Sequence, residues 1–165
     1  MSPSAVRDLS TCDLAQLIRP SGYYHAKALK LKALVRWLSD SCGDNLDQVF
    51  VMETGLLRQQ LLAVYGIGPE TADSILLYAA NKPVFVIDSY TRRICARLGL
   101  IPKEDSYNVS QVVFENNLPQ NVVLFNEYHA LLVRLGKDVC RKQPVCDRCC
   151  LRKICRFQRL SQITH

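Results

Sequence analysis

Four cysteines near the carboxyl end of the chain have the spacing of a metal-binding loop. They follow the pattern Cys140-x5-Cys146-x2-Cys149-x5-Cys155. Four thiolates in one short segment suit an iron–sulfur cube, which can take all its ligands from a compact loop. Structural zinc is the alternative, although zinc modules more often separate two C-x2-C pairs by a longer linker. Cys150 competes with Cys149 for the third position, and the spacing leaves both open.

The other cysteines do not suggest a disulfide framework. The chain contains eight cysteines and no apolar secretory segment, so we expect a reducing compartment. Cys12, Cys42 and Cys95 are scattered outside the loop. Isolated cysteines usually act as small apolar side chains, and we expect these three to be buried.

A second set of residues suits the binding of a phosphate. In Gly66-Ile67-Gly68, two glycines stand two positions apart, and Pro69 follows as a favoured first residue of a helix. Glycines let the backbone come close to a ligand, and the free N–H groups that open a helix attract anions. The segment predicts two helices joined by a tight turn that contacts a DNA phosphate. A helical hairpin without a ligand is the alternative.

One carboxylate follows this turn. Asp88 stands 20 residues beyond Gly68, where an apolar stretch gives way to a segment with helical periodicity. Aspartate is a favoured N-cap because its carboxylate accepts hydrogen bonds from the first N–H groups of a helix. Capping alone would account for Asp88, so a catalytic role depends on the glycine turn upstream.

Positive charge is concentrated near the carboxyl end. The net charge of +6 comes from 21 Lys and Arg against 15 Asp and Glu, and nine bases against two acids fall between Arg134 and Arg159. Such a basic segment fits a polyanion such as nucleic acid, and a solvated surface is the alternative. No run of 18 apolar residues occurs, so we expect neither a membrane span nor an export signal.

The elements that must position these residues are all expected to be helices. Helical periodicity and breakers predict helices at 13–18, 23–38, 55–64, from Pro69 onward, 89–98, 107–117 and 121–135. The helix from Pro69 is expected to bury Ala79 on its apolar stripe, and Gly99 is expected to end the helix at 89–98 with a left-handed residue. Val84–Ile87 is expected to be an extended buried connection because no second strand is available to pair with it. His129 lies on the apolar stripe of the last helix and is expected to be a hydrogen-bonded core residue. Tyr23 and Tyr24 are expected to pack inward.

The run from Leu61 to Leu100, with YGIGPETADSILLYA followed by VFVIDSYTRRICARLGL, resembles the helix-hairpin-helix DNA glycosylase superfamily. The cysteine loop resembles that of endonuclease III. The resemblance implies an all-α protein in two lobes: a helical domain with the hairpin over residues 1–117, and a helical lobe over 118–165 with a [4Fe-4S] cluster on Cys140, Cys146, Cys149 and Cys155. It also implies a monomer that binds double-stranded DNA, flips out a damaged base and cuts its N-glycosidic bond.

The resemblance assigns roles to single residues. Asp88 matches the catalytic aspartate, and Gly66, Ile67 and Gly68 match the hairpin that binds DNA. A fixed carboxylate at Asp88 would stabilise the positive charge that develops on the sugar and would orient water. The source is expected to be bacterial or archaeal and the protein cytoplasmic, associated with the nucleoid.

Three departures qualify the resemblance. Endonuclease III has a lysine two residues after the second hairpin glycine, where its amine attacks the sugar, but this chain has Glu70. This favours the monofunctional branch that includes 3-methyladenine glycosylases. The first cysteine gap is five residues instead of six. The family also has helices ahead of the segment that residues 1–19 resemble, so we expect an incomplete N-terminal part. A DNA-binding remnant without catalysis and a bifunctional glycosylase with lyase activity remain the alternatives.

Overall fold

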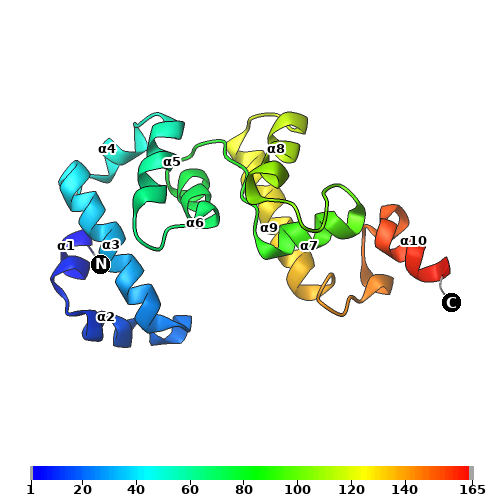
Figure 1. The fold of residues 1–165 in the computed structure, drawn as a ribbon, viewed down its shortest axis with the longest axis horizontal. Helices are drawn as coiled ribbons and strands as arrows, with labels where there is room; N and C mark the ends of the chain where they lie inside the picture. The colour runs from blue at the N-terminus through cyan, green and yellow to red at the C-terminus, as the bar shows by residue number, and fades with distance from the viewer. Residues whose placement is uncertain (1, 164–165) are drawn as a thin grey trace. The chain divides into compact units, whose positions relative to one another are not determined.

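The computed structural model describes residues 2–163 and forms helices, with no β-strand among these residues. The chain divides into two compact units, Met1–Asn81 and Lys82–His165 (Figure 1). The predicted all-α class is therefore confirmed over the described range. None of the described helices is both long and apolar enough to cross a membrane.

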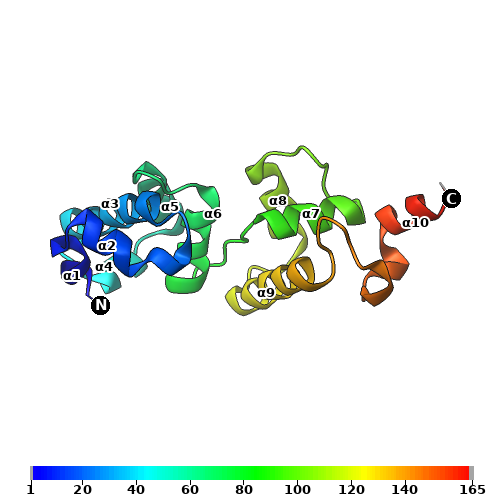
Figure 2. The same ribbon diagram turned by 90° about the horizontal axis from the view of Figure 1, so that it is seen from below.

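In the first unit, α1 and α2 pack against the long helix α3 (Figure 2). Its helices are α1 (Pro3–Asp8), α2 (Thr11–Leu17), α3 (Tyr24–Cys42), α4 (Leu46–Phe50), α5 (Thr54–Ala63) and α6 (Pro69–Ser74). The core between α1, α2 and α3 contains Val6, Leu14, Ala15, Ala28 and Val35. Three buried residues of α3, Ala28, Val35 and Leu38, lie on one face at helical spacing. This apolar face explains why α3 packs against α1 and α2.

Helix α6 does not end at Ser74 but continues as a π-helical turn over Ile75–Ala79. The N–H of Ala80 bonds to the carbonyl of Ile75 at 3.0 Å, one residue farther than in an α-helix. This extra residue changes which side chains face the core. Ala79, expected to be buried from regular helical spacing, is exposed, and Leu77 is buried.

A buried ion pair fixes the two helices of the hairpin. Arg58 on α5 donates to both carboxylate oxygens of Asp73 on α6, at 2.7 Å from Nε to Oδ1 and 3.0 Å from Nη2 to Oδ2. The Asp73 side chain is fully buried and that of Arg58 is 25% exposed. Two parallel hydrogen bonds to one carboxylate also fix the angle between the helices, so this pair defines the geometry of the turn that joins them.

Replacing Arg58 with alanine is expected to destabilise the protein by about 3 kcal/mol, because the Asp73 charge then loses its partner in the interior. Unfolding in urea measures this change. Arg36→Ala, at an exposed arginine of α3, is the control and should change stability by less than about 0.5 kcal/mol. Equal effects of the two substitutions would contradict the role of the pair.

The second unit places α7 against α9 and α10. Its helices are α7 (Ser89–Leu98), α8 (Tyr107–Asn117), α9 (Val122–Asp138) and α10 (Arg156–Ile163). Short 3-10 turns at Cys146–Arg148 and Arg152–Ile154 lie in the cysteine loop. Gly136 allows the close contact of α7 with α9, because a Cβ at this position would collide with the Tyr90 ring. The boundary predicted between a domain over 1–117 and a lobe over 118–165 falls inside the second unit and stays a prediction. Met1 and residues 164–165, which belong to these predicted domains, lie outside the described residues.

The segment Val84–Ile87 is buried and extended without forming a strand, as predicted. A buried backbone needs partners for its polar groups, and here side chains of α8 provide them. The bonds run from the Phe85 N–H to Glu115 Oε1 (2.9 Å), from Gln111 Nε2 to the Phe85 carbonyl (2.7 Å), and from the Ile87 N–H to Tyr107 Oη (3.3 Å). These bonds fix the chain directly before Asp88.

The remaining sequence predictions differ from the structure in detail. The helix expected at 23–38 runs on to Cys42 and ends at Gly43, whose φ of 57° is left-handed. Helices α1, α4 and α10 were not expected. Cys42 and Cys95 are buried as predicted, but Cys12 is exposed, because the buried face of α2 is formed by Leu14 and Ala15.

Candidate active site and nucleic-acid interface

The two glycines of the hairpin turn differ in backbone conformation and in the space around them. Gly66 has a φ of +80°, and a Cβ there would collide with the side chain of Lys30. Gly68 has a φ of −95°, which any residue adopts, and a Cβ there would meet no atom within 4 Å. The fold therefore needs glycine at position 66, whereas the surface around Gly68 is open. Gly68 is also the N-cap of α6, a position at which glycine is favoured, and the open surface leaves room for a ligand to approach.

Asp88 caps α7, and its carboxylate is largely buried. Oδ1 accepts a hydrogen bond from the N–H of Thr91 at 2.7 Å. The side chain is only 11% exposed. The predicted N-cap is thus confirmed, and the left-handed Gly99 ends the same helix as expected.

His129 faces the other oxygen of this carboxylate. Its Nε2 lies 3.7 Å from Asp88 Oδ2, and its side chain is also 11% exposed. Burial raises the pKa of Asp88, but the interactions with His129 and with Thr91 outweigh it and hold this pKa below the ordinary value of 3.8. The carboxylate is therefore charged at neutral pH although it is mostly shielded from water. His129 is a core residue as predicted, and its position beside Asp88 is new.

The four cysteines of the predicted cluster loop line one small cavity. Cys140, Cys146, Cys149 and Cys155 share this cavity with Pro144 and Phe157, among others. No group of three or more His, Cys, Asp or Glu within the described residues is close enough for a single metal ion. The cavity therefore gathers four thiols, which are the donor set of an iron–sulfur cluster.

The cavity also separates the two rival cysteines. Cys149 is half-buried and lines it, whereas Cys150 is exposed and lines a different surface beside Leu131 and Leu151. Adjacent residues here face opposite sides because Cys149 follows the 3-10 turn with an extended backbone. Cys149, and not Cys150, therefore shares the cavity with the other three cysteines, and its role as the third ligand stays a prediction.

Two arginines of α7 connect the Asp88 helix to the cysteine loop. Arg93 donates to the carbonyls of Gly136 and Cys140, each at 2.9 Å. Arg97 donates to Cys140 Sγ at 3.2 Å and to the Arg141 carbonyl at 2.7 Å. The helix capped by Asp88 and the first cysteine of the loop therefore belong to one hydrogen-bonded body.

The two tyrosines before α3 behave differently. Tyr24 is half-buried and packs against the core of the first unit, as predicted. Tyr23 is 90% exposed, so its predicted inward packing is wrong. Its φ of 48° places it in the left-handed region, which turns the ring away from the core and is uncommon for a bulky residue.

Comparison with known proteins identifies the fold. The family model of the HhH-GPD superfamily of base excision DNA repair proteins matches residues 1–120, which include the glycine turn, Asp88 and the helices ahead of them. A complex of endonuclease III with DNA has the same fold, with a TM-score of 0.81 and 23% identity over 98% of this chain and 72% of that chain.

Two further proteins are similar in sequence. A protein of Methanocaldococcus jannaschii whose name describes a DNA repair glycosylase is 41% identical over 86% of this chain. The chain spans 65% of the length of that relative. The H. pylori 3-methyladenine DNA glycosylase MagIII, solved with 1,N6-ethenoadenine, is 28% identical, with a TM-score of 0.68 over 82% of this chain and 66% of that chain. The chain belongs to the HhH-GPD superfamily of base excision DNA repair proteins.

Proposed function

We propose that the protein is a DNA N-glycosylase of base excision repair that releases a damaged base from duplex DNA by hydrolysis. The observation that carries this proposal is the charged, largely buried carboxylate of Asp88 at the start of α7. Membership of the HhH-GPD superfamily and the names of the relatives support it. We expect a monomer in the cytoplasm of a bacterial or archaeal cell.

The chemistry follows from the position of this charge. When the bond between base and sugar breaks, positive charge develops on the sugar ring. A fixed carboxylate in a poorly hydrated position stabilises this charge more strongly than water does. Asp88 supplies the carboxylate, and its second oxygen is held near His129 at 3.7 Å. The flipped nucleotide would then be attacked by water at the sugar carbon.

Glu70 favours hydrolysis over strand cleavage. This exposed residue lies in the first turn of α6, two positions after Gly68, and its carboxylate cannot form an imine with the sugar. The lyase alternative needs an amine. Lys30, whose side chain lies against Gly66, is the lysine to replace if such activity is found.

The four cysteines of the cavity would hold a [4Fe-4S] cluster, which would supply folding energy to the loop rather than take part in base removal. The loop contributes Arg141 and Arg148 to the basic segment. A cluster that fixes these side chains would hold a positive surface for DNA phosphates. MagIII was solved with an alkylated purine, so we propose this class of base as the first substrate to examine.

Gly68→Val is expected to weaken binding to duplex DNA about tenfold without loss of stability, because the added side chain would stand where a phosphate approaches. The control is Gly66→Val, which should destabilise the fold by about 1–2 kcal/mol because of its left-handed φ. Fluorescence anisotropy at matched salt and thermal unfolding measure the two effects. If Gly68→Val binds DNA like the parent, the hairpin is only a structural turn.

The reaction product distinguishes three possible functions: a hydrolytic glycosylase, a glycosylase with lyase activity, and a DNA-binding protein without catalysis. Duplex DNA with one 1,N6-ethenoadenine is incubated with the protein, with and without borohydride. A hydrolase leaves an intact abasic strand that breaks only after alkali, and borohydride traps no complex. A cleaved strand with a trapped protein would show a lyase. Binding without release of this or any other alkylated base would show a DNA-binding remnant.

A further inference from the structure

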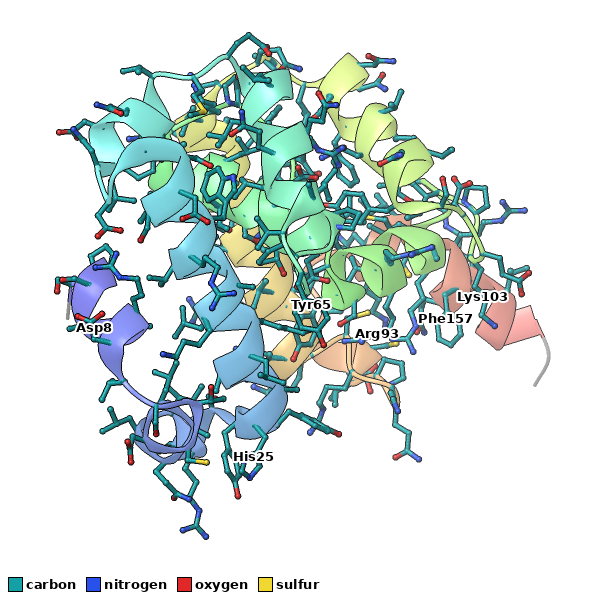
Figure 3. The ribbon with its side chains drawn as sticks, turned by 60° about the vertical axis from the view of Figure 1, so that its left-hand side comes forward. Asp8, His25, Tyr65, Arg93, Lys103 and Phe157 are labelled. Atoms are coloured by element: carbon teal, nitrogen blue, oxygen red, sulfur yellow. The ribbon has the colours of Figure 1, made fainter. Side chains whose placement is uncertain are left out.

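A large basic groove lies along α7 in the second unit. Its lining does not include Asp88, the residue on which the proposed function rests. Its volume is about 910 Å³, and it lies between α7, the loop of Gly99–Lys103 and α10. The labelled side chains of Arg93, Phe157 and Lys103 follow one another along this face in Figure 3. Asp88 caps the amino end of α7 and does not line the groove, whose first lining residue, Arg92, lies about 6 Å farther along the helix axis.

The rim of the groove carries six cations and no carboxylate. They are Arg92, Arg93, Arg97, Lys103, Lys142 and Arg156. Three of them, Arg92, Arg93 and Arg97, stabilise the neighbouring loops because they donate hydrogen bonds to main-chain carbonyls. The side chains of Lys103, Lys142 and Arg156 are exposed and form no ion pair or hydrogen bond within the described residues. Glu104 and Asp105 are the next residues of the loop but do not line the groove.

The floor of the groove is apolar. Leu100 is 54% exposed, Phe157 39% and Leu160 56%, and these side chains come from the loop and from α10. These exposed apolar side chains lie among the cations of the rim, so the groove combines apolar surface with positive charge. Burying it would contribute to affinity in addition to any charge pairing.

We propose that this groove binds an acidic peptide segment of a partner protein, with apolar side chains on the floor and carboxylates at Lys103, Lys142 and Arg156. A duplex offers phosphates but no apolar side chain that reaches a concave floor, so it would leave Leu100 and Leu160 in water. A peptide that alternates acidic and apolar residues satisfies both parts of the groove. The volume also suits a short segment rather than a whole protein surface.

The probe is a short fluorescent peptide in which Asp alternates with Leu and Phe, added to the full chain. Two control peptides keep the length: one replaces Leu and Phe with Ser, and the other replaces Asp with Asn. Anisotropy at low and moderate salt measures affinity. Both controls should bind at least about tenfold more weakly, because each lacks one of the two interactions.

Matched variants locate the site. The double variant Lys103→Ser with Lys142→Ser should weaken peptide binding about tenfold, and Leu160→Ser about threefold. Lys137→Ser with Lys153→Ser removes two exposed lysines of the same unit outside the groove and should change binding less than twofold. Circular dichroism confirms that each variant is folded.

Two outcomes would overturn the proposal. One is an equal loss in the groove and control double variants, which would mean nonspecific charge attraction. The other is tighter binding of a single-stranded thymidine oligonucleotide of equal charge, lost in the groove double variant, which would identify a nucleic-acid groove. The assay uses no base excision, so its result is independent of the proposed glycosylase activity.

Discussion

Asp88→Asn is expected to lower base excision on the order of a thousandfold or more while leaving DNA binding intact. Asparagine has nearly the same size and caps helices as well as aspartate, so its amide oxygen still accepts the Thr91 N–H now bonded at 2.7 Å. Only the negative charge is lost. Single-turnover excision and DNA anisotropy, measured on the same preparation, separate a loss of chemistry from a loss of binding.

The matched control is another capping carboxylate of this chain. Glu53 caps α5 and accepts a hydrogen bond from the Leu56 N–H at 2.8 Å, but it is exposed. Glu53→Gln should leave excision within about twofold of the parent. Full activity of Asp88→Asn, or an equal loss in both variants, would show that Asp88 is a cap without a catalytic role.

Replacing any one of Cys140, Cys146, Cys149 and Cys155 with serine is expected to remove most soluble folded protein. The four thiols line a single cavity, and a loop without a continuous helix depends on its metal group for stability. Anaerobically purified parent protein should be yellow-brown with about four iron atoms per chain. Iron analysis, the visible spectrum and soluble yield measure the effect.

Cys150→Ser provides the control for this series, because Cys150 is exposed and lines another surface. It should keep the colour, the iron content and the yield of the parent. Stoichiometric zinc in a colourless protein would contradict the iron–sulfur proposal. Equal loss of iron in Cys150→Ser and Cys149→Ser would contradict the choice of Cys149.

Local signals in the sequence were sufficient for the elements that carry the site. Asp88 before a helical stripe and Gly99 after it predicted both ends of α7, because capping depends on neighbouring residues. The extended segment Val84–Ile87 was predicted from its composition and from the lack of a partner strand. The glycine turn was also expected, although only Gly66 needs a positive φ.

Contacts between residues far apart in the sequence could not be predicted from such local signals. His129 and Asp88 are on different helices, and only the packing of α9 on α7 brings them together. Periodicity assigned His129 to the core but gave no sign of its partner. The Arg58–Asp73 ion pair also joins two helices, and the spacing of apolar residues along the sequence gave no sign of it. The π-turn after Ser74 arises from main-chain bonding that no residue type in this segment specifies.

The most direct test of the central claim is the release of free base from duplex DNA that contains one alkylated purine, measured by chromatography under single-turnover conditions. The parent protein is expected to release the base stoichiometrically and leave an abasic strand, and Asp88→Asn is expected to release none within the same time. Stable binding of the damaged duplex, without release of any alkylated base by the parent, would contradict the assignment as a glycosylase.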